Sequence, residues 1–377
     1  MDTILRHSSA VKLLASIPRQ LEREPRGSLV LIPISGRETL GALRLDLPLD
    51  AGADAVADLA IGYLCRIPNA EDVITTIWTD SPALDGDGVA HEALAIAIAE
   101  RAEAAGLRVT GEYCVGDDGW TSYARPELRS LAELAEADPD PHAARARHPR
   151  AGAALPRADA ADREEVARQL VALEELPTDP FRRIWEGPRP PAAVAEADDE
   201  LRIFDADPFA GVTPALISTD AAPARAAMWM WIFRCPALRD VMLTAWAGGV
   251  DEGRRACEWQ QEWMAGSQET PEFPIRLAGE GARPSAHRLR AALDFCRGLA
   301  ARAPRTHLAA CLAVCGWLSW ALGNSTHAAE YADRALEIDP RSSFATLIRT
   351  MTDRGILPGW AFDPAGRDAS VRTERVT

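Results

Sequence analysis

Residues 28–34 read SLVLIPI and residues 41–47 read GALRLDL, and these two stretches decide the fold class of the N-terminal part of the chain. In the second stretch, leucine stands at 43, 45 and 47 with charged residues between, a period of two that indicates a strand with one covered face. The first stretch is apolar and carries three β-branched residues, and Pro33 inside it indicates a strand end or an edge position. The segment between them, residues 35–39, suits a hairpin turn. We therefore expect a β-hairpin.

Outward from this hairpin, apolar patterns with the periods of helices and strands alternate along the chain. A short helix over residues 10–17 precedes the hairpin, with Pro18 just after it. Strands that alternate with helices after an initial hairpin favour a mixed sheet with helices packed on it. We therefore predict an α/β domain over residues 1–125, with further helices at 53–65 and 89–105 and further strands at 73–79, 107–115 and 120–123.

Few strand patterns appear in the second half of the chain. Residues 126–160 are predicted to hold a helix from Pro126 to Ala137 and then a mobile linker rich in Pro, Ala, Arg and Asp. Residues 161–362 are predicted to form an all-α domain, and residues 363–377 a disordered tail. The clearest helices of the all-α domain are expected at 221–233, 237–247 and 253–264. The change of period near the middle of the chain predicts two separately built cores.

Tryptophan and methionine concentrate between residues 228 and 263. Residues 228–233 read MWMWIF, and a helix that is apolar around its whole circumference is central to a core or part of an interface. Core packing is the ordinary explanation. The alternative is a surface that binds a protein partner or a second copy of the chain, because Trp and Met are enriched at interfaces. The candidate interaction residues are Trp229, Trp231, Trp246, Trp259 and Trp263.

The pattern over residues 308–340 is similar to one tetratricopeptide repeat. Small residues and turn residues fall at the spacing of two helices that cross closely. At least three repeats are normally needed for an independent solenoid, so we expect one repeat-like hairpin inside a larger bundle. The residues that fit the pattern are Leu312, Cys315, Gly316, Gly323, Ala328, Ala332, Ala335 and Pro340.

Charge and cysteine usage restrict the partners and the compartment. The net charge is −15, which argues against nucleic acid and anionic membrane as partners because both require clustered positive charge. The seven cysteines are an odd number within apolar runs, which indicates a reducing compartment, and residues 1–10 lack a signal-peptide core. Residues 308–323 are the most apolar stretch but are shorter than a membrane span. We expect a cytoplasmic protein.

Carboxylates gather after the predicted strands, where α/β proteins bind ligands. Asp46 follows the hairpin, and Asp80, Asp85 and Asp87 follow the strand at 73–79. Oxygen ligands of this kind could hold Mg²⁺ or Mn²⁺, which would make the chain a divalent-metal-dependent enzyme. The alternative is that Asp87 and Asp54 cap helices while the others keep loops solvated. No other cofactor is expected.

The order of several motifs resembles that of a bacterial family named only as domain-of-unknown-function family 4192. The resemblance runs along most of the chain and implies a fold without implying an activity. The chain has Leu21-Glu22-Arg23-Glu24 where family members often carry Leu-Gly-Phe, and residues 124–141 lack a cysteine group that many members have there. The motifs that carry the resemblance are Pro25-Arg26-Gly27-Ser28-Leu29-Val30, Leu43-Arg44-Leu45-Asp46-Leu47-Pro48, Gly119-Trp120-Thr121-Ser122-Tyr123, Leu238-Arg239-Asp240 and Cys315-Gly316-Trp317-Leu318.

No catalytic residue can be assigned from the sequence. The chain has no Gly-x-Ser-x-Gly nucleophile elbow, and no motif ties a histidine to Ser28, which begins a strand. The leading hypothesis is therefore a non-catalytic module for protein interaction or self-association, with the metal-dependent enzyme as the alternative.

Overall fold

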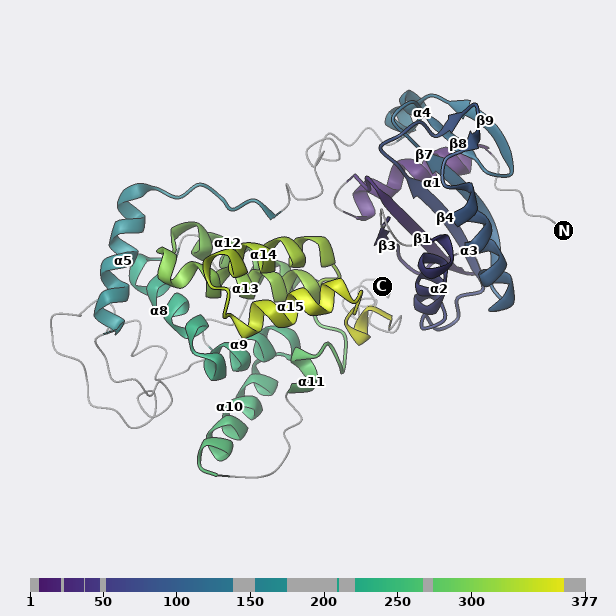
Figure 1. Ribbon diagram of the computed structural model, residues 1–377. Coiled ribbons are helices and arrows are strands. Elements are labelled where there is room, and N and C mark those ends of the chain that lie inside the picture. Colours follow the sequence, from purple (N-terminus) through teal and green to yellow (C-terminus); the bar gives the residue numbers. More distant parts are fainter. Residues whose placement is uncertain are drawn as a thin grey trace, which may run out of the picture. The chain divides into compact units, whose positions relative to one another are not determined.

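A computed structural model of the chain describes residues 7–21, 24–36, 38–47, 52–137, 153–174, 209, 221–266 and 274–362. The chain divides into two units, Met1–Gly152 with Phe362–Thr377, and Ala153–Ala361 (Figure 1). The predicted tail, and the linker up to residue 152, lie outside the described residues. No helix among the described residues is both long and apolar enough to cross a membrane.

The first unit is built on a seven-stranded mixed sheet. The strand order is β2-β1-β4-β7-β8-β9, and β3 also pairs with β1. Strands β4 and β7 are parallel and joined through helix α3, whereas the other pairs are antiparallel. The strands are β1 (Ser28–Ser35), β2 (Glu38–Thr39), β3 (Leu43–Asp46), β4 (Asp72–Trp78), β7 (Arg108–Val115), β8 (Trp120–Ser122) and β9 (Arg125–Arg129).

The predicted hairpin is confirmed by the pairing of β1 with β3. The two strands run antiparallel from Ser28 opposite Asp46 to Leu31 opposite Leu43. The edge position inferred from Pro33 is wrong, because β4 pairs with β1 along its other side. Pro33 instead lies between the part of β1 that pairs with β3 and the part that pairs with β2. Proline has no backbone N–H to donate to a neighbouring strand. This loss costs little at Pro33, because the hydrogen bonds on that side of β1 are interrupted there.

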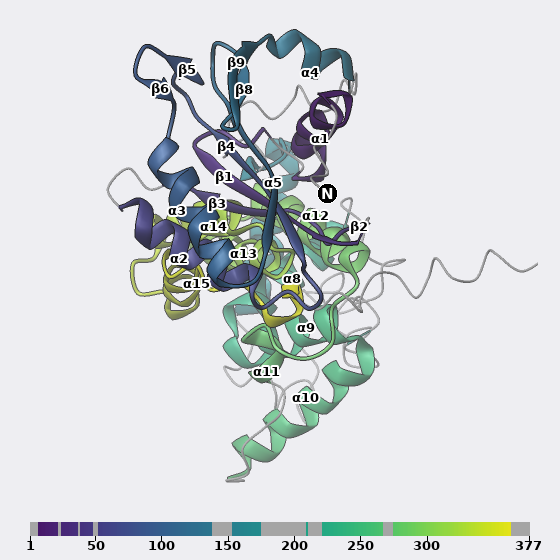
Figure 2. The same cartoon turned by 90° about the vertical axis from the view of Figure 1, so that its right-hand side faces the viewer.

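Helices cover both faces of this sheet, as Figure 2 shows. Leu29 and Leu31 pack with α2 (Ala53–Leu64) and α3 (Glu92–Ala104) on one face. Val30 and Ile32 pack with α1 (His7–Gln20) and α4 (Leu131–Ala137) on the other. Successive side chains of a strand point to opposite faces, so a strand covered on both sides is apolar throughout.

Several boundaries in this unit differ from the predicted ones. Helix α1 begins at His7 and continues through Pro18 to Gln20. The helix predicted from Pro126 begins only at Leu131, because residues 125–129 form β9 and pair with β8. Helix α3 begins at Glu92 instead of Val89, because Val89 belongs to a small hairpin of β5 (Leu84–Asp85) and β6 (Gly88–Val89). In the last two cases, strand pairing outweighs helix propensity.

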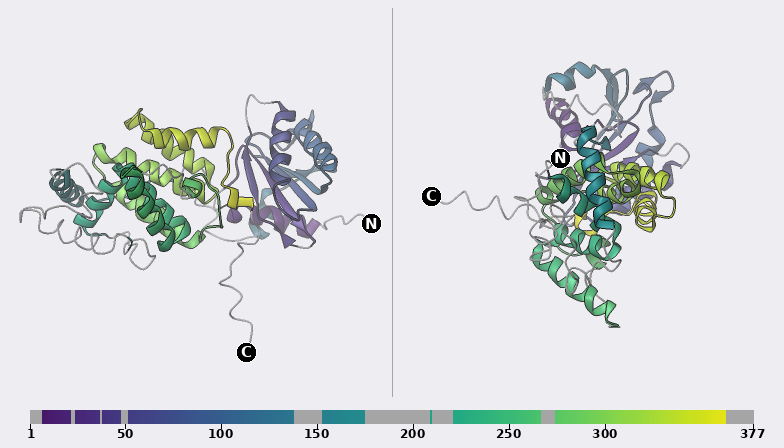
Figure 3. Two further views of the ribbon diagram at one scale, coloured as in Figure 1. Left: turned by 90° about the horizontal axis from the view of Figure 1, so that it is seen from below. Right: turned by 90° about the vertical axis from the view of Figure 1, so that its left-hand side faces the viewer.

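The second unit is all-helical in its described residues, as predicted for the C-terminal part of the chain. Helices α12 to α15 follow one another as neighbours, and Figure 3 shows them together as the light-green to yellow part of the chain. The described helices of this unit are α5 (Ala160–Glu174), α8 (Pro223–Arg234), α9 (Pro236–Gly248), α10 (Val250–Met264), α11 (Pro274–Leu277), α12 (Ala286–Arg302), α13 (Arg305–Ala321), α14 (Ser325–Ile338) and α15 (Ser343–Asp353).

Helices α13 and α14 form a closely packed hairpin. A Cβ atom on Gly316 would lie 3.3 Å from the carbonyl oxygen of Ala328, so glycine permits the close approach of the two helices. Gly323 has φ +82° in the connection, a conformation that glycine adopts without strain. Ala328, Ala332 and Ala335 are buried. The hairpin itself is present, and its kinship with tetratricopeptide repeats stays a prediction.

Candidate interaction site of the helical unit

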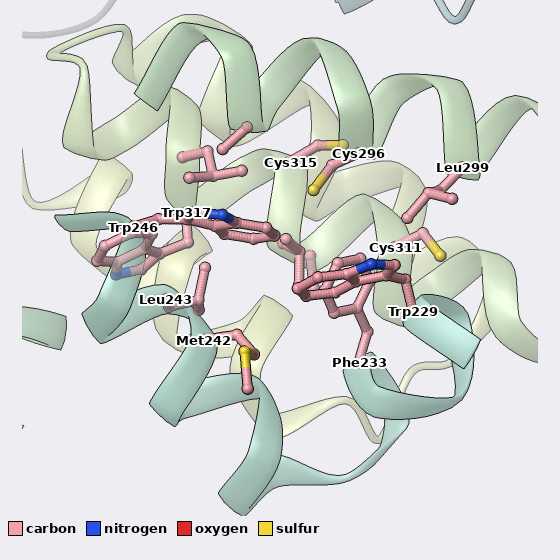
Figure 4. Close-up of a cluster of buried hydrophobic side chains, with 14 of the residues drawn as sticks. Trp229, Phe233, Met242, Leu243, Trp246, Cys296, Leu299, Cys311, Cys315 and Trp317 are labelled. Atoms are coloured by element: carbon pink, nitrogen blue, oxygen red, sulfur yellow. The ribbon is translucent and has the colours of Figure 1, made fainter. Parts of the chain in front are cut away.

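Two of the five candidate tryptophans belong to the core of the helical unit. The rings of Trp229 on α8 and Trp246 on α9, both labelled in Figure 4, stack with their centroids 5.4 Å apart. Phe295 on α12 meets Trp229 edge-on at 5.6 Å. Trp229 and Trp246 are 2% and 0% exposed. Because neither ring reaches the surface, both residues act as core packing groups, and the interaction role predicted for them stays a prediction to which this structure gives no support. Trp231 is partly buried and also packs against this core.

The other two tryptophans, Trp259 and Trp263, form a stacked pair on α10. Their ring centroids are 5.6 Å apart, with an angle of 26° between the ring planes. A spacing of four residues puts both rings on one side of the helix. Trp263 is 50% exposed, and it is the one aromatic residue among the large exposed hydrophobic side chains of the described chain.

The C-terminal half of α10 projects beyond the other described helices of its unit. Both Figure 1 and Figure 2 show this end as an extension from α9 and α11. The helix remains attached through its first turns, where Gly253, Ala256 and Cys257 are buried. A Cβ on Gly253 would lie 2.5 Å from the Ala245 methyl, so glycine lets α10 cross close to α9. The tryptophan pair therefore lies on an exposed extension of a firmly packed helix.

Charged side chains fix the base of α10. The Nε and Nη2 atoms of Arg276 each donate a hydrogen bond to the Glu252 carboxylate, at 2.6 Å. Arg288 donates to the carbonyl oxygens of Trp246 and Ala247, at 2.6 and 2.7 Å, and so satisfies the last turn of α9. The Arg276 hydrogen bonds hold the pKa of Glu252 below its ordinary value, while burial lowers the pKa of Arg288.

Both signs of charge surround the tryptophan pair along α10. Arg254 and Arg255 are exposed on the N-terminal side of the pair, and Glu258 and Glu262 are exposed beside the rings. An aromatic centre within a rim of charged groups is the usual composition of a protein contact surface. This composition is compatible with a binding role. None of these side chains is an activated nucleophile or general base.

The four carboxylates predicted as metal ligands have separate roles. Asp46 forms an ion pair with Arg44, and Asp80 lies 3.7 Å from a guanidinium nitrogen of Arg26. Asp85 accepts from the backbone N–H of Asp87, at 2.9 Å, within the turn between β5 and β6. Across the described ranges, no group of three or more His, Cys, Asp or Glu side chains is arranged to hold a metal ion.

The helix caps considered for Asp54 and Asp87 are wrong. Gly52 and His91 stand at the N-caps of α2 and α3, and neither cap makes a side-chain hydrogen bond. Asp54 instead pairs with Arg101, and so links α2 to α3. The acid that organises the loops after β4 and β7 is Asp118, whose carboxylate accepts from the Ala83 N–H at 2.7 Å.

The buried cysteines are packing groups. Cys296, Cys311 and Cys315 lie in the core of the helical unit, and burial raises the pKa of each thiol, to about 12 for Cys315. A thiol needs a lowered pKa and access to solvent to act as a nucleophile. In the first unit, burial likewise raises the pKa of Cys114 to about 11.

The motifs that carry the family resemblance serve the structure of the two units. Trp120 is buried in the sheet unit, and the Tyr123 hydroxyl donates to the carbonyl oxygen of Ala90 at 2.6 Å. The Arg239 guanidinium lies 3.9 Å from the centre of the Phe344 ring, and so joins α9 to α15. The Trp317 indole N–H donates to the carbonyl oxygen of Leu277 at 3.1 Å.

Two arginines of the helical unit, Arg297 on α12 and Arg334 on α14, bind a distant segment of the chain and were not among the predicted site residues. Both donate hydrogen bonds to backbone carbonyls of the segment that precedes α5. Single arginines in helices form no motif, so no sequence signal identifies them. The extended dipeptide Leu155-Pro156 between the linker and α5 is the one available hint.

A family described as a domain of unknown function (DUF4192) matches residues 11–276 and 281–359. No curated protein and no solved structure matches the chain.

Proposed function

We propose, for a chain that belongs to the DUF4192 family, that the helical unit is a non-catalytic module for protein interaction. Its contact surface is centred on the stacked pair of Trp259 and Trp263 at the projecting end of α10. The observation that carries the proposal is the half-exposed ring of Trp263. The occupant is another protein or a second copy of the chain, and the protein is expected to work in the cytoplasm.

The physical argument starts from the cost of leaving an indole ring in water. Burying the remaining half of a tryptophan side chain against a partner removes apolar area from water at about 25 cal/mol per Å². Tryptophan is also rigid, and the stack on Trp259 fixes its ring further, so little conformational entropy is lost on binding. These properties explain why tryptophan is enriched among the residues that dominate binding energy.

The test compares the wild-type chain with Trp263→Ala and Val171→Ala. Val171 is 58% exposed on α5 of the same unit and serves as the matched control. Light scattering after size exclusion gives the mass of each protein, and tagged chains capture partners quantitatively from native lysate. We expect Trp263→Ala to weaken dimer formation, or to reduce the amount of captured partner, about tenfold or more. Truncation of a residue that dominates binding costs at least about 2 kcal/mol. A strictly monomeric wild type that captures nothing, or equal behaviour of the two variants, contradicts the proposal.

A further inference from the structure

Residues 153–158, here termed the strap, lie alongside α12 and α14; Ala153 has 3-10 conformation, and the residues after it belong to no helix or strand and form an extended trace. Arg334 on α14 donates to the carbonyl oxygen of Ala153 at 3.1 Å, and Arg297 on α12 donates to that of Ala154 at 2.7 Å. Figure 1 shows this part of the chain as the teal trace that leads into α5. Two helices that are distant in sequence from the strap thus bind its main chain with side-chain donors.

The sequence of the strap favours this extended form. Pro156 fixes its own φ near −65° and disfavours the helical conformation for Leu155. Asp159 then ends the strap, because its carboxylate accepts from the N–H of Ala160 at 2.8 Å where α5 begins. Pro156 and the Asp159 cap therefore restrict the conformations open to the strap at its C-terminal end.

The surface beneath the strap is specific in two ways. The Ala153 side chain is 1% exposed, so this position accepts only a small residue. Leu155 is half-buried against the core of the unit. The guanidinium groups of Arg297 and Arg334 also lie near the thiol of Cys315, and the Tyr331 hydroxyl lies beside Arg297. When an arginine is held by packed side chains, its guanidinium N–H groups point in fixed directions, as recognition of a peptide main chain requires.

We infer that the α12–α14 surface around Arg297 and Arg334 is a binding site for an extended peptide segment of a partner protein, and that the strap occupies this site in cis. The site takes a peptide with a small residue over the Ala153 position, an apolar residue two positions later, and main-chain carbonyls toward the two arginines. It is separate from the tryptophan pair on α10 and does not depend on the function proposed for that pair.

The contacts of the strap are few enough for exchange. Ala154, Pro156 and Arg157 are exposed, and within the strap only Ala153 is fully buried. Helix α5 holds the chain independently, since Val166, Leu170 and Leu173 lie in the core. The strap can therefore leave the site while the helical unit stays folded. A partner peptide then competes with a tethered segment. Its apparent affinity is the intrinsic affinity multiplied by the fraction of time that the strap leaves the site open.

The experiment uses the full chain and a labelled peptide with the strap sequence AALPRADA, acetylated at its N-terminus. Ala153→Leu places a side chain that is too large for the buried position and displaces the strap without adding charge beside the two arginines, whereas Ala154→Leu changes the exposed neighbour and is the matched control. If the strap is seated about nine-tenths of the time, fluorescence anisotropy shows a Kd about tenfold lower for Ala153→Leu than for Ala154→Leu. Adding Arg297→Ala and Arg334→Ala to Ala153→Leu abolishes this binding.

Leu155→Ser is the second opening variant, because it removes the apolar contact at a half-buried surface position, adds no charge and leaves the core intact. It gives the same gain in peptide affinity as Ala153→Leu. Circular dichroism verifies that each variant is folded. The inference is overturned if folded Ala153→Leu and Leu155→Ser bind the peptide no more tightly than Ala154→Leu, or if the two arginine substitutions leave binding unchanged.

Discussion

Trp246 and Trp263 lie on consecutive helices and have opposite environments. Trp246 is fully buried between Trp229 and Phe233, whereas half of Trp263 faces water. Within the core, each indole fills volume that no other side chain would fill. On α10 the same side chain extends past the last residues that reach the core. Position along the helix, and not residue type, therefore decides which tryptophan is available to a partner.

The two tryptophans give opposite results in unfolding experiments. We expect Trp246→Ala to lower the free energy of unfolding by about 3–5 kcal/mol, because it removes a buried ring and leaves a cavity. Trp263→Ala lowers it by about 1 kcal/mol or less, as expected for an exposed position. Urea titration followed by circular dichroism measures both. Equal losses for the two variants would show that Trp263 is a core residue.

At the scale of elements, the corner between α9 and α10 positions the contact surface. Gly249 has φ +104°, which allows the chain to turn sharply between the two helices. Arg288 satisfies the end of α9, and the pair of Glu252 and Arg276 ties α10 to α11. Because Glu252 and Arg276 are 26% and 11% exposed, this pair is less screened than a surface ion pair.

The pair of Glu252 and Arg276 predicts a specific pH dependence. Its hydrogen bonds hold the pKa of Glu252 in the folded chain below the ordinary value of 4.5. A depressed folded-state pKa contributes stability above the unfolded-state pKa, and this stability is lost as the pH falls through the folded-state pKa. Glu252→Gln therefore lowers the free energy of unfolding at pH 7 by about 1–3 kcal/mol, and its difference from wild type shrinks below about pH 4.5.

Urea titrations of the wild type and the variant between pH 3 and pH 7 measure this difference. Glu258→Gln is the matched control, since Glu258 is exposed on the same helix. A difference between wild type and Glu252→Gln that stays constant over this range would mean that Glu252 does not gain stability from Arg276.

Elements with strong local patterns could be predicted from the sequence. The alternating leucines of β3 and the apolar run of β1 predicted the hairpin, and Gly316 and Gly323 predicted the close packing of α13 and α14. Strand β9 could not be predicted, because its residues are mostly exposed and are held by pairing with β8 instead of by an apolar pattern. Local sequence carries no record of such nonlocal pairing.

The candidate sites were less predictable than the elements, for a related reason. Asp46 and Asp80 pair with nearby arginines, and Asp85 accepts from the backbone of its own turn, so these carboxylates do not form one site. Trp259 and Trp263 could be recognised as a pair from their spacing, but their exposure depends on where α10 leaves the bundle. The strap depends on two arginines that lie more than 140 residues from it in the sequence.

At the scale of the whole molecule, each unit has its own hydrophobic core. One face of the sheet packs on α2 and α3 and the other on α1 and α4, while the tryptophan-rich core lies wholly within residues 153–360. A unit that is stable by itself can present a contact surface without rearrangement, which limits the entropy lost on binding. Both proposed binding features, the tryptophan pair and the strap site, belong to this helical unit.

Site-specific photo-crosslinking at residue 263 tests the central claim most directly. A photoreactive phenylalanine analogue replaces Trp263, and in a control protein it replaces Val171, and each is irradiated in intact cells. The account predicts one discrete adduct from position 263 and none from position 171, at twice 40.8 kDa for a second copy and at another mass for a different protein. No adduct from position 263, or the same adducts from both positions, would contradict it.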